Sequence, residues 1–275
     1  LGPRYQEIAR DVRLAALVHA DETGFRVDGQ PSWLWVFVSQ VAAYYTVGNR
    51  SKEIPREVLG EDFQGILVCD GWPSYRVVGG RCQRCWIHLI RHLQAVESTY
   101  GVEARGPLDP SPAKFTRAGH PPTRFLAFDD ALRAVLREAV AYWERAPAKA
   151  TWGRRKKARA FERQVRRLCD LESADRDVRR ISKELLDHMD ALFTFVELPG
   201  VPWHNNAAES AVRAGVLARK VSGGRRSDEG ARAYSVLMSV KETSRRRGED
   251  WMRVVTQALA GLGPPGHSTR DLAKA

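Results

Sequence analysis

The chain has 275 residues, 43% of them hydrophobic, which is enough for a sizeable core and excludes a globally disordered protein. Its 44 Lys and Arg against 33 Asp and Glu give a formal net charge of +11, which favours a polyanionic partner such as nucleic acid over the alternative of a merely soluble basic protein. Four cysteines exclude a disulfide framework, and the absence of an apolar run of about 20 residues predicts no membrane-spanning helix.

The first third of the chain predicts a series of strands. Residues 15–21 are apolar and predict a short buried strand that ends at Asp21. Aromatic and β-branched side chains predict two further strands at 32–39 and 42–48, and the turn VDGQP before the first of them suits a hairpin. A short helix at 54–60 follows. Two more strands, at 65–70 and 81–86, complete an expected mixed α/β sheet.

The rest of the chain predicts helices. One begins after residue 86, and a Pro/Gly-rich loop at 106–122 follows it. Apolar residues then recur at helical spacing in three stretches, at 132–143, 161–168 and 181–192. The segment LPGVP, 198–202, closes this helical block. Two last helices are expected at 204–220, with Asn205 or Asn206 as N-cap, and from 230 to a stop at Gly248.

Three acidic residues are candidates for a metal site. Asp21 and Asp70 each end an apolar strand, and such ends meet at one edge when the strands are parallel neighbours. Close carboxylates repel unless a cation neutralises them, and oxygen ligands suit Mg²⁺. Glu209 is a weaker candidate for a third ligand, with Arg213 one helical turn later near a phosphate. The alternatives are acids in loops and a surface ion pair.

The three acids lie within a set of four motifs, which are HADETGFRVDGQPSWLWVFVS, GEDFQGILVCDGWPSY, RCWIHLIRHL and NNAAESAVR followed by ARKVSGGRRSDEGARAY. In this order the motifs resemble the transposase of the insertion sequence 66 family (TnpC-type). The resemblance extends over nearly all of residues 17–250 except the region around 100–195. It implies a DDE transposase with an RNase H-like fold. The implied catalytic triad, holding two Mg²⁺ or Mn²⁺ ions, is Asp21, Asp70 and Glu209.

The resemblance also implies a domain organisation. The RNase H-like core would occupy 1–99 and, with Glu209, 201–250. An all-helical insertion would occupy 100–200, and a C-terminal tail 251–275. Expected partners are DNA, as transposon ends and as target, a second copy in a homodimer or higher assembly, and accessory proteins of the same element. No membrane partner is expected, and the place would be the prokaryotic cytoplasm, at the nucleoid.

The function has two alternatives. One is an RNase H-like nuclease that cleaves without strand transfer, and the other is a non-enzymatic, domesticated DNA-binding protein. The sequence also departs from the family. Members usually have a longer N-terminal part, with a coiled-coil or DNA-binding region and a zinc-binding segment, so we do not expect this sequence alone to recognise a transposon end. Ser210 stands where Arg is common, so one phosphate contact is expected to be missing.

A group of cysteines and histidines follows the second aspartate: Cys82, Cys85, His88 and His92. The C-x-x-C spacing is suggestive of zinc. Zinc-finger ligand pairs are normally separated by about 12 or more residues, however, so zinc is not expected. The resemblance offers another interpretation, because CWIH matches the C-x-x-H of several DDE transposases. Active-site support would then come from Cys85, His88, Asn206 and Arg213, whereas the plainer alternative is a core cysteine and a capping histidine.

Two basic segments are candidates for contact with DNA. The first, 152–167, predicts a helix that carries Arg155, Arg159 and Arg163. The second, 218–227, combines a flexible Gly-Gly pair with four cations, which are Arg219, Lys220, Arg225 and Arg226. Such cations can contact phosphates, although a solvated charged face is the alternative for the first segment.

Overall fold

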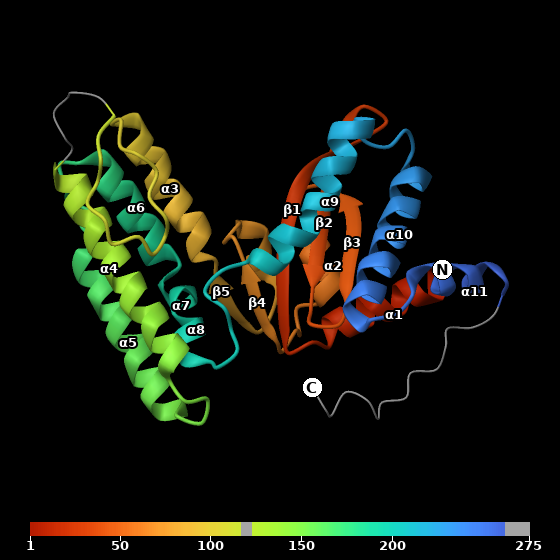
Figure 1. Cartoon of the computed structure of the whole chain (residues 1–275), viewed down its shortest axis with the longest axis horizontal. Helices are drawn as coiled ribbons and strands as arrows, with labels where there is room; N and C mark the ends of the chain where they lie inside the picture. Colours follow the sequence, from red (N-terminus) through yellow and green to blue (C-terminus); the bar gives the residue numbers. More distant parts are fainter. Residues whose placement is uncertain (117–122, 262–275) are drawn as a thin grey trace. The chain divides into compact units, whose positions relative to one another are not determined.

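The computed structural model describes residues 1–116 and 123–261 (Figure 1). The chain divides into two compact units. Unit 1 comprises Leu1–Gly65, Arg76–Gly79 and the described residues from Asn206 onward, and unit 2 comprises the described residues of Ile66–Tyr75 and Gly80–Asn205. Five strands form one mixed sheet in the order β3-β2-β1-β4-β5. The expected mixed α/β class with flanking helices is therefore confirmed.

The strands of unit 1 form an antiparallel meander of β1 (Leu17–Val27), β2 (Gln30–Val38) and β3 (Ala43–Gly48). The hairpin at VDGQP is confirmed, because Asp28 and Gly29 have φ of 49° and 72° in the turn between β1 and β2. The expected end of the first strand at Asp21 was wrong. Asp21 pairs with Val36 inside the ladder. Pairing with β2 continues beyond the polar residues that follow Asp21, so β1 ends only at Val27.

Unit 1 contains five helices among its described residues: α1 (Gly2–Arg13), α2 (Glu53–Leu59), α9 (Asn206–Ser222), α10 (Asp228–Arg247) and α11 (Trp251–Leu259). Helices α9 and α10 pack on one face of the meander and share a core with it (Figure 1). The helix α9 lies close to the sheet because Gly215 has no side chain. A Cβ there would lie 2.1 Å from Cδ2 of Leu34.

The helices α1, α10 and α11 differ in how well local sequence patterns predict them. Gly248 ends α10 in the left-handed conformation, with φ of 67°, as predicted. The sequence patterns did not reveal α1, which buries few apolar side chains. Part of the expected tail is helical, since α11 begins after the N-cap Asp250. The rest of that tail, 262–275, lies outside the described residues.

Unit 2 contains two strands that pair in parallel, β4 (Ile66–Cys69) and β5 (Arg81–Arg84), together with a set of helices. These helices are α3 (Trp86–Thr99), α4 (Thr123–Arg145), α5 (Thr151–Leu168), α6 (Arg176–Asp187), α7 (Met189–Leu192) and α8 (Thr194–Glu197). A short 3₁₀ turn, η1 (Pro73–Val77), follows β4. The pattern at 181–192 covers α6 and α7, which are separated at His188, and residues 117–122 of the predicted loop lie outside the described residues.

A buried ionic network holds α3 and α4 of unit 2 together. Arg133 on α4 contacts Asp129 at 2.9 Å and Glu97 at 3.2 Å. Arg105 contacts the same two carboxylates at 2.5 and 2.7 Å. All four side chains are at most 5% exposed. Within residues 1–116 and 123–261, no helix has the length and apolar composition that crossing a bilayer requires.

Candidate active site

Asp70 lies directly after β4 in unit 2, as the sequence predicted, and its side chain is half-buried. Its Oδ1 accepts a hydrogen bond from the backbone N–H of Trp72 at 2.8 Å. Gly71 between them has φ of 92°, a conformation that L side chains rarely adopt. An ionised carboxylate offers about four acceptor positions, so Asp70 retains capacity to bind a cation.

Arg84 at the end of β5 fixes the loop that carries Asp70. Its Nε donates to the backbone oxygen of Asp70 at 3.3 Å, and its guanidinium also forms an ion pair with Glu184 on α6. The packing is tight, because a Cβ at Gly71 would lie 2.6 Å from Nε of Arg84. The Arg84 side chain is only 4% exposed, so this contact is shielded from water.

The Glu184 carboxylate is the counter-ion of the Arg84 guanidinium. Burial alone would raise the pKa of Glu184, but the hydrogen bond with His92 and the charge of Arg84 lower it to about 2. Glu184 is therefore ionised at neutral pH and holds Arg84 in place. Sequence reasoning missed both Arg84 and Glu184, because no local pattern reveals a contact between residues so far apart in the chain.

The four Cys and His residues after Asp70 have diverse partners. Cys82 lies beside Cys69, with the two sulfurs 3.6 Å apart, and His92 contacts Glu184 at 2.8 Å. Cys85 is fully buried at the N-cap position of α3, where its sulfur accepts the backbone N–H of Asn205 at 3.3 Å. His88 is half-buried one turn later. A role of Cys85 and His88 in supporting the active site stays a prediction.

The two acids of the opening HADET motif lie on opposite faces of β1 in unit 1. Glu22 has a side chain only 1% exposed and forms an ion pair with Arg50 at 2.9 Å. The Arg50 guanidinium in turn lies over the ring of Trp33, at 4.2 Å. Asp21 is half-buried and lies on the same face as Phe25, because side chains alternate along a strand. That face is the one that α9 covers.

Glu209 lies in the first turn of α9 in unit 1 and is half-buried. The helix begins at Asn206, so Asn205 takes the N-cap position. Arg213 is exposed one turn after Glu209. Unit 1 thus contains two of the three predicted ligands, Asp21 and Glu209, and α9 packs on the face of the meander where Asp21 lies.

The basic helix of the sequence analysis is α5 in unit 2. Arg155, Arg159 and Arg163 are all exposed and recur at a spacing of one turn. Arg155 has a carboxylate, that of Glu197, at 3.7 Å. The neighbouring Arg154 is different, since it is buried and its guanidinium donates to backbone oxygens, including that of Val196 at 3.1 Å. Three of the arginines predicted to contact DNA therefore face solvent.

The second basic segment comprises the end of α9 and a hydrogen-bonded turn after it, which contains the Gly-Gly pair that was expected to be flexible. Its backbone pairs with β1, where the N–H of Arg225 donates to Arg26 at 2.9 Å and the N–H of Asp28 donates to Arg225 at 2.8 Å. The Arg219 guanidinium donates to the backbone oxygen of Gly24 at 2.7 Å. The Arg225 guanidinium lies over the Tyr234 ring. Two of the four cations, Lys220 and Arg226, are exposed.

Comparisons with known proteins bear on what these residues do. A family model described as "Transposase IS66 family" matches residues 1–233. Among curated proteins, "Uncharacterized protein y4jO" of Sinorhizobium fredii (strain NBRC 101917 / NGR234) is 31% identical over 91 residues. That match covers 33% of this chain and 28% of the relative, so the chain matches less than a third of the relative's length.

Proposed function

The chain belongs to the IS66 transposase family, and we propose that it is a catalytic domain that cleaves DNA phosphodiester bonds and transfers the freed strand to a target. The observation that carries this proposal is the family match over residues 1–233, which includes all three predicted acidic ligands. The proposed fold of the catalytic part is RNase H-like, with the helices of residues 100–200 as an insertion. The mixed five-stranded sheet supports this assignment.

The proposed catalytic and metal-binding residues are Asp21, Asp70 and Glu209. Their chemistry suits Mg²⁺ or Mn²⁺, because all three are half-buried carboxylates and hard divalent cations prefer oxygen ligands. Two such ions, when bound, activate a water and stabilise the leaving oxygen of an in-line displacement. Asp21, Asp70 and Glu209 would together supply the protein oxygen ligands that hold these ions.

The chain's own residues would keep these ligands in position. Arg84 and the left-handed Gly71 fix the backbone at Asp70, and the packing of α9 on the meander fixes the helix that carries Glu209. We propose that the active site is further supported by Cys85, His88, Asn206 and Arg213. The 3′-OH freed by cleavage would then attack a phosphodiester of the target DNA held at the same site and displace a 3′-OH of the target strand, so one set of residues would serve both steps.

DNA is the proposed substrate, both as transposon ends and as target. Exposed cations on α5, at the end of α9 and on the turn after it support this proposal, because each one can release a counter-ion from a phosphate. A second copy of the chain and accessory proteins of the same element are proposed partners. The prokaryotic nucleoid is the proposed place of action.

A strand-transfer assay tests the function directly. The chain would be incubated with Mg²⁺, a target plasmid and duplexes that carry a pre-cleaved end of the element. We expect a covalent joint between the duplex and the target, absent when EDTA replaces Mg²⁺. Nicking of the plasmid without joints would instead support a nuclease, and DNA binding without nicking would support a non-enzymatic DNA-binding protein.

The arginines of α5 give a separate prediction about affinity. Replacing Arg155, Arg159 and Arg163 by Ala should weaken DNA binding and make the slope of log affinity against log salt shallower by up to about 3, because each duplex phosphate contact contributes about 0.9. Fluorescence anisotropy with a labelled duplex at several salt concentrations measures the slope. At saturating DNA the cleavage rate should change little.

The matched control removes three exposed cations of the same unit from another helix, α6, by replacing Arg176, Arg180 and Lys183 with Ala. Its loss of formal charge is the same as that of the α5 variant. If the two variants have equal salt slopes, α5 is a solvated face and has no specific place in the DNA-binding surface.

A further inference from the structure

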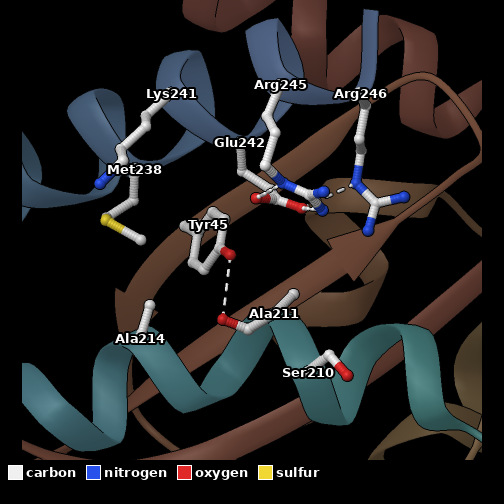
Figure 2. A pocket seen from close by; sticks show the side chains of 9 residues that line it. All are labelled: Tyr45, Ser210, Ala211, Ala214, Met238, Lys241, Glu242, Arg245 and Arg246. Atoms are coloured by element: carbon white, nitrogen blue, oxygen red, sulfur yellow. Dashed lines mark hydrogen bonds and ion pairs between the residues drawn. The ribbon is translucent and has the colours of Figure 1, made fainter.

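A pocket in unit 1 lies between α9 and α10 over β3 (Figure 2). Its volume is about 310 Å³, and its walls combine charged and apolar side chains. Ser210, at its edge, directly follows the proposed ligand Glu209 in α9. None of the motifs of the sequence analysis predicts this pocket, because its walls come from three separate segments of the chain.

One wall of the pocket is cationic. Lys241, Arg245 and Arg246 on α10 line it together with a single acid, Glu242 (Figure 2). Glu242 forms ion pairs with Arg245 at 2.6 Å and Arg246 at 3.1 Å, so the four charged side chains keep a net positive charge. Lys241 and Arg245 are exposed, and the Lys241 ammonium lies 5.9 Å from the centre of the Trp251 ring. This wall therefore favours an anion.

The rest of the lining is mainly apolar. It comprises Ala211 and Ala214 on α9, the ring of Tyr45 on β3, and Met238, which lies beside Lys241 on α10 (Figure 2). The Tyr45 hydroxyl donates to the backbone oxygen of Ala211 at 3.0 Å, and burial raises the pKa of Tyr45, so it stays a neutral donor. Methyl and thioether groups make few favourable contacts with an inorganic phosphate, but they pack well against the flat face of a base or against a sugar.

We propose that this pocket binds one unpaired nucleotide of a DNA strand, with its phosphate at Lys241 and Arg245 and its base and sugar against Ala214 and Met238. The volume lies at the lower end of the usual range for small-ligand pockets, about 300–1,000 Å³, and so suits a single nucleotide. The choice of DNA over a free nucleotide rests on the proposed function. An intact duplex cannot fill the pocket, because its bases stay stacked.

Binding to three probes separates the sources of such a ligand. The full chain would be titrated with a blunt duplex, with the same duplex carrying a short single-stranded overhang, and with thymidine 5′-monophosphate. We expect the overhang duplex to bind about tenfold more tightly than the blunt duplex, because burying one base against apolar side chains contributes about that order of affinity. Binding of the mononucleotide alone, without a preference for the overhang, would overturn the DNA strand as the source.

Two variants test the two sides of the pocket. Lys241→Ala with Arg245→Ala should remove the preference for the overhang and make the salt slope on the overhang duplex shallower by about 0.7, since the two cations share one phosphate and each single-strand phosphate contact contributes about 0.7. Ala214→Leu should fill the apolar side and remove the preference without changing the salt slope. The matched control, Arg10→Ala with Lys52→Ala, removes two exposed cations of unit 1 outside the pocket.

The outcomes keep this proposal distinct from the proposed function. If the pocket variants keep the overhang preference, or lose no more of it than the control, the pocket has no role in binding a nucleotide. That result leaves strand transfer by the parent chain unaffected. If the parent chain prefers the overhang and the pocket variants lose that preference, the pocket is a nucleotide site even when the strand-transfer assay yields no joints.

Discussion

Replacing Asp70 by Asn should lower the rate of DNA cleavage by on the order of 10³-fold or more, because a metal-bound site contributes several kcal/mol to the stabilisation of the transition state. The substitution keeps the side-chain oxygen that accepts the backbone N–H of Trp72, so the turn after β4 should survive. It removes only the negative charge that a divalent cation needs. Single-turnover cleavage with DNA in excess measures the effect, and the affinity for DNA should change little.

A second measurement shows whether the effect involves the metal. Mg²⁺ or Mn²⁺ should raise the melting temperature of the parent chain, since a ligand at about 100 times its dissociation constant stabilises the folded state by about 2.7 kcal/mol. Most of that rise should disappear in Asp70→Asn. The same loss is expected in Asp21→Asn and in Glu209→Gln, because all three carboxylates are proposed to hold the ions.

Asp109 provides a matched control in the same unit. Its Oδ1 accepts the backbone N–H two residues later, that of Ser111, at 2.8 Å, in the same way as Asp70. Asp109→Asn should therefore leave cleavage and the metal response as they are in the parent. Equal cleavage by Asp70→Asn and the parent, or an unchanged metal response in the variant, would remove Asp70 from the proposed site.

Local signals in the sequence predicted several features correctly. Asp70 follows β4 directly because an apolar run, GILVC, gives way to a polar turn. The hairpin at Asp28 and Gly29 was predictable because its turn needs residues that tolerate positive φ. In each case the physical cause lies within a few neighbouring residues.

Features that depend on pairing between distant segments were not predicted. The strand β1 continues past Asp21 because β2 pairs with it, so the loss of apolar residues at Asp21 and Glu22 does not end the strand. The bonds between Arg84 and Glu184 join β5 to α6, and no spacing along the chain reveals them. The same holds for the turn after α9, because its two glycines do not predict the backbone hydrogen bonds that join it to residues 26–28.

The buried ionic network of unit 2 is a fourth feature of this kind, and it predicts a large effect on stability. Arg133→Ala should lower the free energy of unfolding by about 3–5 kcal/mol, because removing one partner leaves buried charges without compensation. Arg133 is fully buried and contacts both Asp129 and Glu97. Urea denaturation followed by far-UV circular dichroism measures the loss, since unit 2 contains the long helices α4 and α5.

Arg137, one turn later on α4, is the control, because it is only half-buried and donates to a backbone oxygen, that of Asp109, at 3.2 Å. Arg137→Ala should cost less than Arg133→Ala. Arg133→Met separates packing from charge, since Met keeps much of the volume but supplies no cation. If Arg133→Met were as stable as the parent chain, the network would contribute packing alone and the electrostatic argument would be wrong.

The loss of stability on replacing Arg133 should depend on pH, because the carboxyl group of Asp129 has a shifted pKa. Burial raises the pKa of Asp129, and the positive charge of Arg133 opposes that rise. Without Arg133 the pKa of Asp129 should rise further in the folded state, whereas the unfolded chain keeps its ordinary value. A carboxyl group with a raised folded-state pKa contributes stability below its unfolded pKa and loses that contribution as the pH rises through the folded value. The stability deficit of Arg133→Met should therefore be larger at pH 8 than at pH 5, and a deficit that does not change over this range would exclude Asp129 as its cause.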